Sequence, residues 1–223
     1  MSILSAILFF LTQHPFWSWP LLTLFGVALS HVLARWRGSP GWYGLILVFF
    51  IYGQLNIFLA HIFNALFLSA FGVPGTGVVT HSEMTSSTLN DANVWAYSAA
   101  LKTADGKDVV TTFDSMSASI YPITNAILIP PEGERFVTRY IPGFPRNFVI
   151  MRNQSSYGIR QMVAEDRAPV DKAANQLAAS PGNRAFIDEY RDALTRFLGK
   201  HREDADPALI ERYQAALDAL PRR

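Results

Sequence analysis

Residues 42–71 read WYGLILVFFIYGQLNIFLAHIFNALFLSAF, thirty consecutive residues without a charged side chain. An α-helix rises about 1.5 Å per residue, so a helix of this length exceeds the roughly 30 Å that the hydrocarbon core of a bilayer requires. We therefore predict that residues 42–71 form a transmembrane helix.

A second uncharged segment, residues 16–34, is about as long as a crossing requires. Pro20 is expected near its start, where a missing amide donor costs least. Aromatic side chains of the kind that collect at headgroup boundaries flank the two segments: Trp17, Trp19, Trp36, Trp42 and Tyr43. The two segments together predict a helical hairpin in the membrane.

The N-terminal segment is apolar but short. Residues 2–12 form only about 17 Å of helix, which is too little to cross a bilayer alone. We expect an interfacial or re-entrant segment over residues 2–13 that ends before Pro15. A secretory signal peptide is the alternative, but nothing basic precedes Arg35, and a signal peptide needs a basic start.

Charged residues are distributed unevenly along the chain. Arg35 and Arg37 are the only charged side chains before Glu83, although the chain has 19 Lys+Arg and 18 Asp+Glu. Short loops that carry Lys or Arg are retained on the cytoplasmic side, so both termini are expected to face outward. In a bacterium this arrangement predicts a two-span inner-membrane protein whose N- and C-termini are periplasmic.

The composition argues against several functional classes. The chain contains no cysteine, which excludes disulfide frameworks, thiolate catalysis and Cys-ligated zinc. Its net charge of +1 argues against a nucleic-acid partner. No HxxxH pair, P-loop or Gly-x-Ser-x-Gly motif occurs. We therefore predict no enzymatic activity, no metal and no cofactor.

The middle of the chain, residues 73–152, has the pattern of a small β-domain. Short β-branched or aromatic runs alternate with turn residues, and residues 104–107 predict a tight hairpin with a type I′ turn. Five or six strands in so short a segment favour a closed barrel, which leaves no exposed sheet edge. The predicted strands are Val78–His81, Val94–Lys102, Asp108–Phe113, Ile127–Ile129, Arg135–Tyr140 and Asn147–Met151.

Short motifs in this region resemble a bacterial family. Gly77-Val78-Val79 opens a strand, Asp105-Gly106-Lys107 forms a hairpin, and Glu132-Gly133-Glu134 leads into the run RYIPGFP at residues 139–145. Over residues 73–152 these motifs are similar to a widespread family of membrane-anchored small β-domains, known as a domain of unknown function. The resemblance implies an anchored β-domain, and no catalytic residue is carried over. Family members often have transmembrane helices on both sides of the β-domain, whereas here both precede it.

Four polar residues within the second span are candidate binding residues: Gln54, Asn56, His61 and Asn64. Gln54 and His61 are seven residues apart and so share a helix face, with Asn64 one turn further on. Such residues can mark a proton or ion path, for which His61 beside Asn64 would be the titratable group. Hydrogen bonding between helices is the interpretation that we favour, because no Asp, Glu, Lys or Arg accompanies them.

Two further groups of polar residues are candidates for binding. Arg135, Arg139, Arg146 and Arg152 cluster along the last two predicted strands and could contact anionic lipid headgroups, although an ordinary solvated face is the simpler interpretation. Residues 114–119 are similar to Asp-x-Ser-x-Ser loops that bind Mg²⁺, but Met116 stands at the first serine position. We therefore interpret residues 114–119 as a polar loop.

The helical tail, residues 153–223, returns to a helical period. Pro169 is expected to begin or interrupt its first helix. Two amphipathic segments follow, one over residues 186–199 and one that Asp206 caps, with Pro207 in its first turn. They predict a C-terminal α-helical hairpin whose apolar stripes cover the β-domain, each other or a second chain.

These observations predict a membrane protein of α+β class with three parts: a membrane domain (1–72), a β-rich extracytoplasmic domain (73–152) and a helical tail (153–223). We expect a non-catalytic protein that contacts the lipid bilayer and binds a protein partner, as a subunit or accessory factor of an envelope complex. The alternative is a membrane-anchored immunity protein that neutralises a periplasm-acting toxin. A hydrolase or ion-coupled carrier would require His61 or a loop carboxylate.

Overall fold

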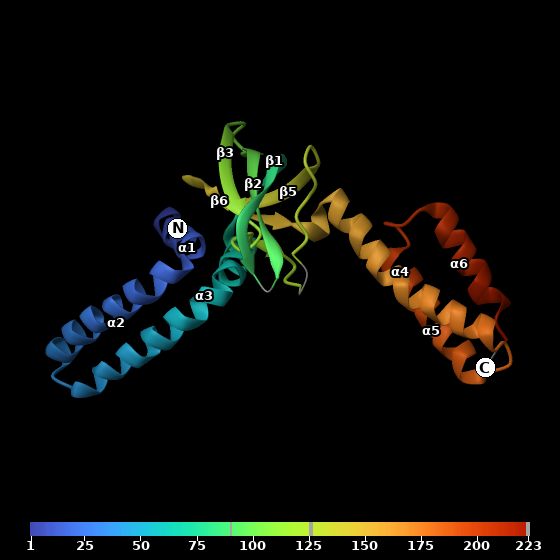
Figure 1. The fold of residues 1–223 in the computed structure, drawn as a ribbon, viewed down its shortest axis with the longest axis horizontal. Helices are drawn as coiled ribbons and strands as arrows, with labels where there is room; N and C mark the ends of the chain where they lie inside the picture. The colour runs from blue at the N-terminus through green and yellow to red at the C-terminus, as the bar shows by residue number, and fades with distance from the viewer. Residues whose placement is uncertain (90, 125–126, 222–223) are drawn as a thin grey trace. The chain divides into compact units, whose positions relative to one another are not determined.

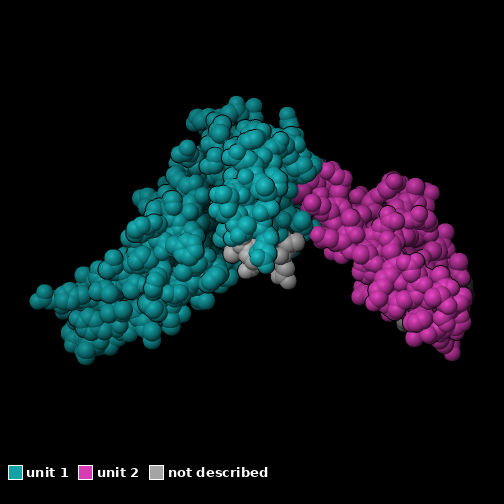
Figure 2. Space-filling view, viewed as in Figure 1, with its two compact units in different colours: residues 1–155 teal, residues 156–223 magenta. Residues whose placement is uncertain are grey.

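The computed structural model of this chain describes residues 1–89, 91–124 and 127–221. The chain forms two compact units, residues 1–155 and residues 156–223 (Figure 2). The first unit contains the apolar helices and a β-sheet, and the second is helical. The predicted α+β class is confirmed.

The first unit begins with three apolar helices, α1 (Ser2–Gln13), α2 (Pro15–Arg37) and α3 (Gly44–Phe71), with a 3₁₀ turn η1 (Pro40–Tyr43) before α3. The stretches Pro15–Arg37 and Pro40–Phe71 are long and apolar enough to cross a membrane. Only 17% of the residues in each apolar window are buried, whereas the core helix of a soluble protein is mostly buried. Because α2 begins at Pro15, Pro20 lies inside this helix rather than at its start.

The helices α2 and α3 run side by side as a hairpin (Figure 1). Two glycines allow their close approach. A Cβ atom on Gly53 would lie 3.1 Å from the Cα of Trp19, and one on Gly26 would lie 2.6 Å from the Cβ of Phe49. At Gly38, where φ is +64°, the backbone turns into the left-handed conformation that commonly ends a helix.

The sheet contains β1 (Val73–Leu89), β2 (Ala92–Lys102), β3 (Asp108–Asp114), β4 (Ile120–Tyr121), β5 (Arg135–Ile141) and β6 (Phe144–Met151). The strand order is β3-β2-β1-β5-β6-β4, with β4 parallel to β6 and the other pairs antiparallel. Only Gly72 separates α3 from β1. The end of α3 packs against β5 and β6 through a core of Ala65, Leu68, Ile141, Val149 and Met151.

The predicted closed barrel is wrong, because the sheet is open and mixed. Closure would require a hydrogen-bonded ladder between the edge strands β3 and β4, but β4 has only two residues. The edge strand β3 instead reaches β6 through a side chain, since Thr111 Oγ1 donates to the carbonyl of Arg146 at 3.2 Å.

Two local predictions are also corrected. Residues 127–129 are not a strand, and Pro130 and Pro131, which directly follow, have no amide hydrogen for a ladder. Of residues 103–107, all of which the structure describes, Gly106 alone has a positive φ, at 82°. Its amide donates to the carbonyl of Thr103 at 2.9 Å, so the hairpin turn is type I followed by a glycine bulge and not type I′.

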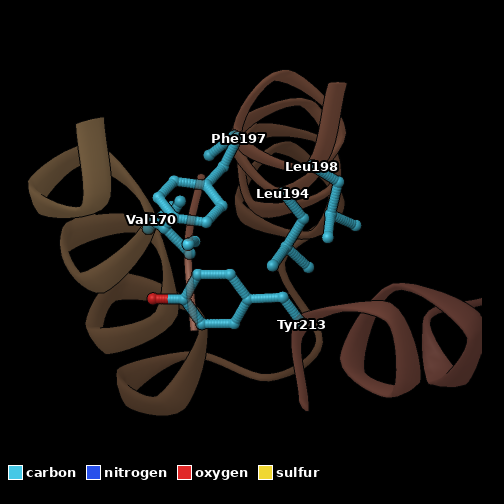
Figure 3. Close-up of a cluster of buried hydrophobic side chains, with 8 residues drawn as sticks. Val170, Leu194, Phe197, Leu198 and Tyr213 are labelled. Carbon is cyan, nitrogen blue, oxygen red and sulfur yellow. The ribbon is translucent and has the colours of Figure 1, made fainter. Parts of the chain in front are cut away.

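The second unit contains α4 (Ser156–Ala179), α5 (Arg184–His201) and α6 (Pro207–Ala219), and the turn η2 (Arg152–Gln154) precedes it. All three helices contribute to one apolar core, in which Tyr213 of α6 meets Val170 of α4 and Phe197 of α5 (Figure 3). The predicted helical hairpin is therefore a three-helix unit. Pro169 lies inside α4 without ending it, and Asp206 caps α6 as predicted.

Candidate functional site

A buried polar contact in the first unit joins the membrane-length helix α3 to the sheet. Asn64 of α3 donates to the Oδ1 of Asn147 on β6 at 2.8 Å, and Asn147 donates to the Oδ1 of Asn64 at 2.9 Å. Both side chains are buried, with 2% and 1% of their surface exposed. Buried amides are stable only when they are paired, so this reciprocal pair fixes α3 against β6.

Two serines extend the pair into a network. Asn147 also donates to the carbonyl and the Oγ of Ser5 on α1, at 2.9 and 3.0 Å. Asn64 also donates to the Oγ of Ser119, just before β4, at 2.8 Å. We call Ser5, Asn64, Ser119 and Asn147 the amide network, which joins four segments that are distant in the sequence.

Asn56 makes a second buried contact, among the three apolar helices. Its Nδ2 donates to the Oγ of Ser18 on α2 at 2.8 Å and to the carbonyl of Leu11 on α1 at 3.3 Å. Asn56 therefore makes the hydrogen bonds between helices that the sequence predicts, whereas Asn64 bonds a strand of the sheet and the residue before β4 rather than another helix. Gln54 and His61 are half-buried and take part in neither contact.

A small cavity of about 20 Å³ lies beside the amide network, between Thr12 and Gln13 of α1 and Ser117 and Ser119 of the loop that joins β3 to β4. A space of this size holds about one water molecule. It is too small for a substrate or cofactor, so the amide network connects elements of the fold and does not form a ligand pocket.

The four arginines do not form one exposed patch. Arg135 and Arg146 are exposed, whereas Arg152 is buried. Arg139 is half-buried, and its Nη1 donates at 2.8 Å to the carbonyl of Ser69, in the last turn of α3. A cation at the C-terminus of a helix interacts favourably with the helix dipole, so Arg139 fastens β5 to the end of α3.

The loop after β3 is organised by its own aspartate. Asp114 Oδ1 accepts hydrogen bonds from the amides of Met116 and Ser117, at 2.9 and 2.7 Å. This is an Asx turn, in which the carboxylate satisfies backbone donors. Across the described part of the chain, no group of three or more His, Asp or Glu side chains could hold a metal ion.

Sequence reasoning missed an apolar groove at the end of the β1–β2 hairpin. The groove has a volume of about 480 Å³ and is lined mainly by Val94, Trp95, Tyr97, Met116, Ile127 and Ile129. Trp95 is 40% exposed, Met116 38% and Ile127 56%. Partial burial raises the pKa of the Tyr97 hydroxyl above its usual value. Trp95 was the residue in the sequence that could have indicated this groove. The alternation of side chains along a strand, taken alone, predicts that Trp95 is buried in a core.

We call this feature the Trp95 groove. It brings together β2, the loop after β3 and residues 127–129, which are separate in the sequence. The resemblance of residues 73–152 to a family of anchored β-domains stays a prediction. No protein-family model, no curated protein and no solved structure matches this chain.

Proposed function

We propose that this chain is a non-catalytic protein of the bacterial inner membrane whose extracytoplasmic sheet binds a protein partner, as a subunit or accessory factor of an envelope complex. The observation that carries the proposal is the Trp95 groove, an apolar surface on the β-sheet side of the first unit.

The anchoring part of the proposal rests on α2 and α3. Both are long and apolar enough to cross a bilayer. A short loop joins them, and Arg35 and Arg37 lie in the last turn of α2, next to this loop. Basic residues in a short loop favour its retention in the cytoplasm. The sheet then lies on the periplasmic side, as do both termini.

The binding part of the proposal rests on the composition of the groove. Contiguous apolar surface on a water-facing domain commonly marks an interaction site. Tyr, Trp and Met are enriched in protein–protein interfaces, and Trp and Tyr are over-represented among the residues that contribute most of the binding energy. A groove of about 480 Å³ that is open to solvent fits an apolar side-chain cluster of a partner chain.

The test is co-purification in mild detergent with the tagged full chain. We expect a partner that co-purifies with the wild type to be lost with Trp95→Glu, because a buried unpaired carboxylate is costly in an apolar interface. Val110→Glu is the matched control, since Val110 is 66% exposed on β3 and does not line the groove. Retention of the partner by Trp95→Glu would contradict the proposed binding surface. A solitary, monodisperse wild-type protein would contradict the subunit role.

A further inference from the structure

We infer that α1 contacts lipid acyl chains in the leaflet next to the sheet, so that α1 is a fixed, lipid-facing part of the membrane domain. This inference rests on the proposed membrane anchoring. It assigns a role to residues 2–13 and names the molecules that cover their outer face.

The buried and the exposed side chains of α1 differ in kind. Ser5, Leu11 and Thr12 of α1 are buried against the rest of the unit. Its exposed large side chains are apolar: Ile3 is 77% exposed and Ile7 is 51% exposed, and Leu4 and Phe10 are also exposed. Helix α1 thus buries the polar side chains of Ser5 and Thr12 and exposes large apolar ones, which is unlike a surface helix of a water-soluble domain.

Two anchors fix the depth of α1 along α3. Leu11 accepts a hydrogen bond from Asn56, and Ser5 connects through Asn147 to Asn64. Asn56 and Asn64 are eight residues apart on α3, a distance of about 12 Å along the helix axis. The segment Ser5–Leu11 therefore lies beside that length of α3.

This length of α3 falls within the apolar layer. Counting from Gly44, where α3 begins, a hydrocarbon core of about 30 Å takes about 20 residues, which ends near Asn64. The part of α3 between Asn56 and Asn64 then lies in the hydrocarbon core of the bilayer, at the end that is nearer to the sheet. Asn64, at the end of this part, contacts Asn147 of β6, and the residues of α3 that follow pack against β5 and β6.

The outer face of α1 is matched by exposed apolar side chains on both neighbouring helices. Phe16 and Trp17 are exposed at the start of α2, and Phe58 and Leu66 are exposed on α3. Lipid acyl chains surround α2 and α3 at this depth, and they are an apolar environment in which the exposed apolar side chains of α1, α2 and α3 are all stable. The structure thereby assigns lipid, rather than a second protein, as the occupant of this face.

The chain contains no cysteine, so one introduced cysteine carries the only nitroxide spin label. The full chain is reconstituted in phosphatidylcholine vesicles with a label at Ile7→Cys, and separately at Ile3→Cys as a second position on the same face. Leu24→Cys on α2 is the membrane reference and Val110→Cys on β3 the water reference, and both native side chains are exposed. The measurement is the ratio of accessibility to oxygen over accessibility to a water-soluble nickel chelate.

We expect the ratio at position 7 to lie close to that at position 24 and far above that at position 110. A ratio at positions 3 and 7 equal to that at position 110, with position 24 still in lipid, would place α1 in water and overturn the inference alone. Labels at positions 3 and 7 that are immobilised and inaccessible to both reagents would show a protein covering, and would also overturn it. Nickel access at position 24 would instead contradict the membrane anchoring itself.

Discussion

Asn64 and Asn147 each donate one hydrogen bond to the other, at 2.8 and 2.9 Å, although they are 83 residues apart in the sequence. One belongs to a helix that is long enough to span a bilayer, and the other to a strand of the sheet. The reciprocal pair therefore links an apolar helix to the sheet through buried side chains, in addition to the chain connection at Gly72.

Replacement of one asparagine of this pair should lower the free energy of unfolding by more than the loss of an ordinary hydrogen bond, because a buried polar atom of the other asparagine is left unsatisfied. Asn64→Leu leaves the buried Oδ1 of Asn147 without the donor that Asn64 provides, and we expect the free energy of unfolding to fall by about 1–3 kcal/mol. The double variant Asn64→Leu/Asn147→Leu should lose less than the sum of the two single losses, since no orphaned amide remains. The measurement is chemical unfolding of the detergent-solubilised chain.

The control for this cycle is Asn93→Leu, because Asn93 is an exposed asparagine on β2. It should change the free energy of unfolding by less than about 0.5 kcal/mol. Strict additivity of Asn64→Leu and Asn147→Leu would show that the two amides are not coupled.

The helix hairpin should not tolerate a methyl group at Gly53. A Cβ atom there would lie 2.9 Å from Trp19 Cδ1 and 3.2 Å from its carbonyl oxygen, so the backbones must separate. We expect Gly53→Ala to lower the free energy of unfolding by about 1–3 kcal/mol. Gly44→Ala is the matched control, since nothing lies within 4 Å of its Cβ position. Equal stabilities of the two variants would refute the close approach.

Loss of the Arg139 guanidinium on β5, which donates a hydrogen bond to the last turn of α3, should destabilise that turn. Arg139→Met keeps the apolar stem but removes the hydrogen bond to Ser69. We expect faster amide hydrogen exchange in the last turn of α3 and a loss of up to about 2 kcal/mol. Arg135→Met, an exposed arginine on the same strand, should leave exchange unchanged. Similar exchange in both variants would mean that Arg139 does not cap α3.

The second unit should lose stability in acid. Partial burial opposes ionisation of Asp166, but hydrogen bonds from Lys200 and His201, at 2.5 and 2.6 Å, outweigh it and hold the pKa of this carboxyl below its usual value. A carboxyl with a lowered folded-state pKa stabilises the fold above its unfolded pKa, and this contribution is lost as pH falls through the folded pKa. The decline is therefore expected below about pH 4.

This acid dependence can be followed by helical circular dichroism of the full chain between neutral and acidic pH. Asp166→Asn should remove the part of the decline that Asp166 causes and should lower stability at neutral pH. Glu211→Gln replaces an exposed carboxyl on α6 and should leave the acid profile unchanged. An Asp166→Asn profile identical to the wild type would exclude Asp166 as the source.

The proposed orientation predicts which single cysteines a membrane-impermeant maleimide reaches in spheroplasts. Val110→Cys on the sheet should be modified in intact spheroplasts, whereas Ser39→Cys, in the loop after α2, should be modified only after lysis. Both native side chains are exposed, so differences in labelling report sidedness rather than burial. The opposite pattern would place the sheet in the cytoplasm.

The parts of the fold that depend on local pattern could be predicted from the sequence. The uncharged run that contains α3 predicts a membrane-length helix, and Asp206 with Pro207 predicts the start of α6. Strands β2 and β3 were predicted because their β-branched runs flank a hairpin with Gly106 at its turn. Each of these signals lies within a few residues of the element that it specifies.

The parts that depend on distant residues could not be predicted. The strand β4 exists only because Ile120 and Tyr121 meet Ile150 and Met151 of β6, and nothing in their local sequence specifies that register. Ser5 and Asn147 are 142 residues apart, so their hydrogen bond is visible only after folding. The Trp95 groove likewise combines segments whose proximity the strand pattern does not reveal.

Gly72 is the only residue between α3 and β1, and its amide still donates to the carbonyl of Leu68 at 2.9 Å. The sheet that carries the Trp95 groove is therefore joined to α3 without a flexible linker. With the proposed anchoring, it travels with its helix at a constant height and searches in two dimensions rather than three. A productive encounter then requires a partner that also presents its contact at that height, as another resident of the same bilayer does.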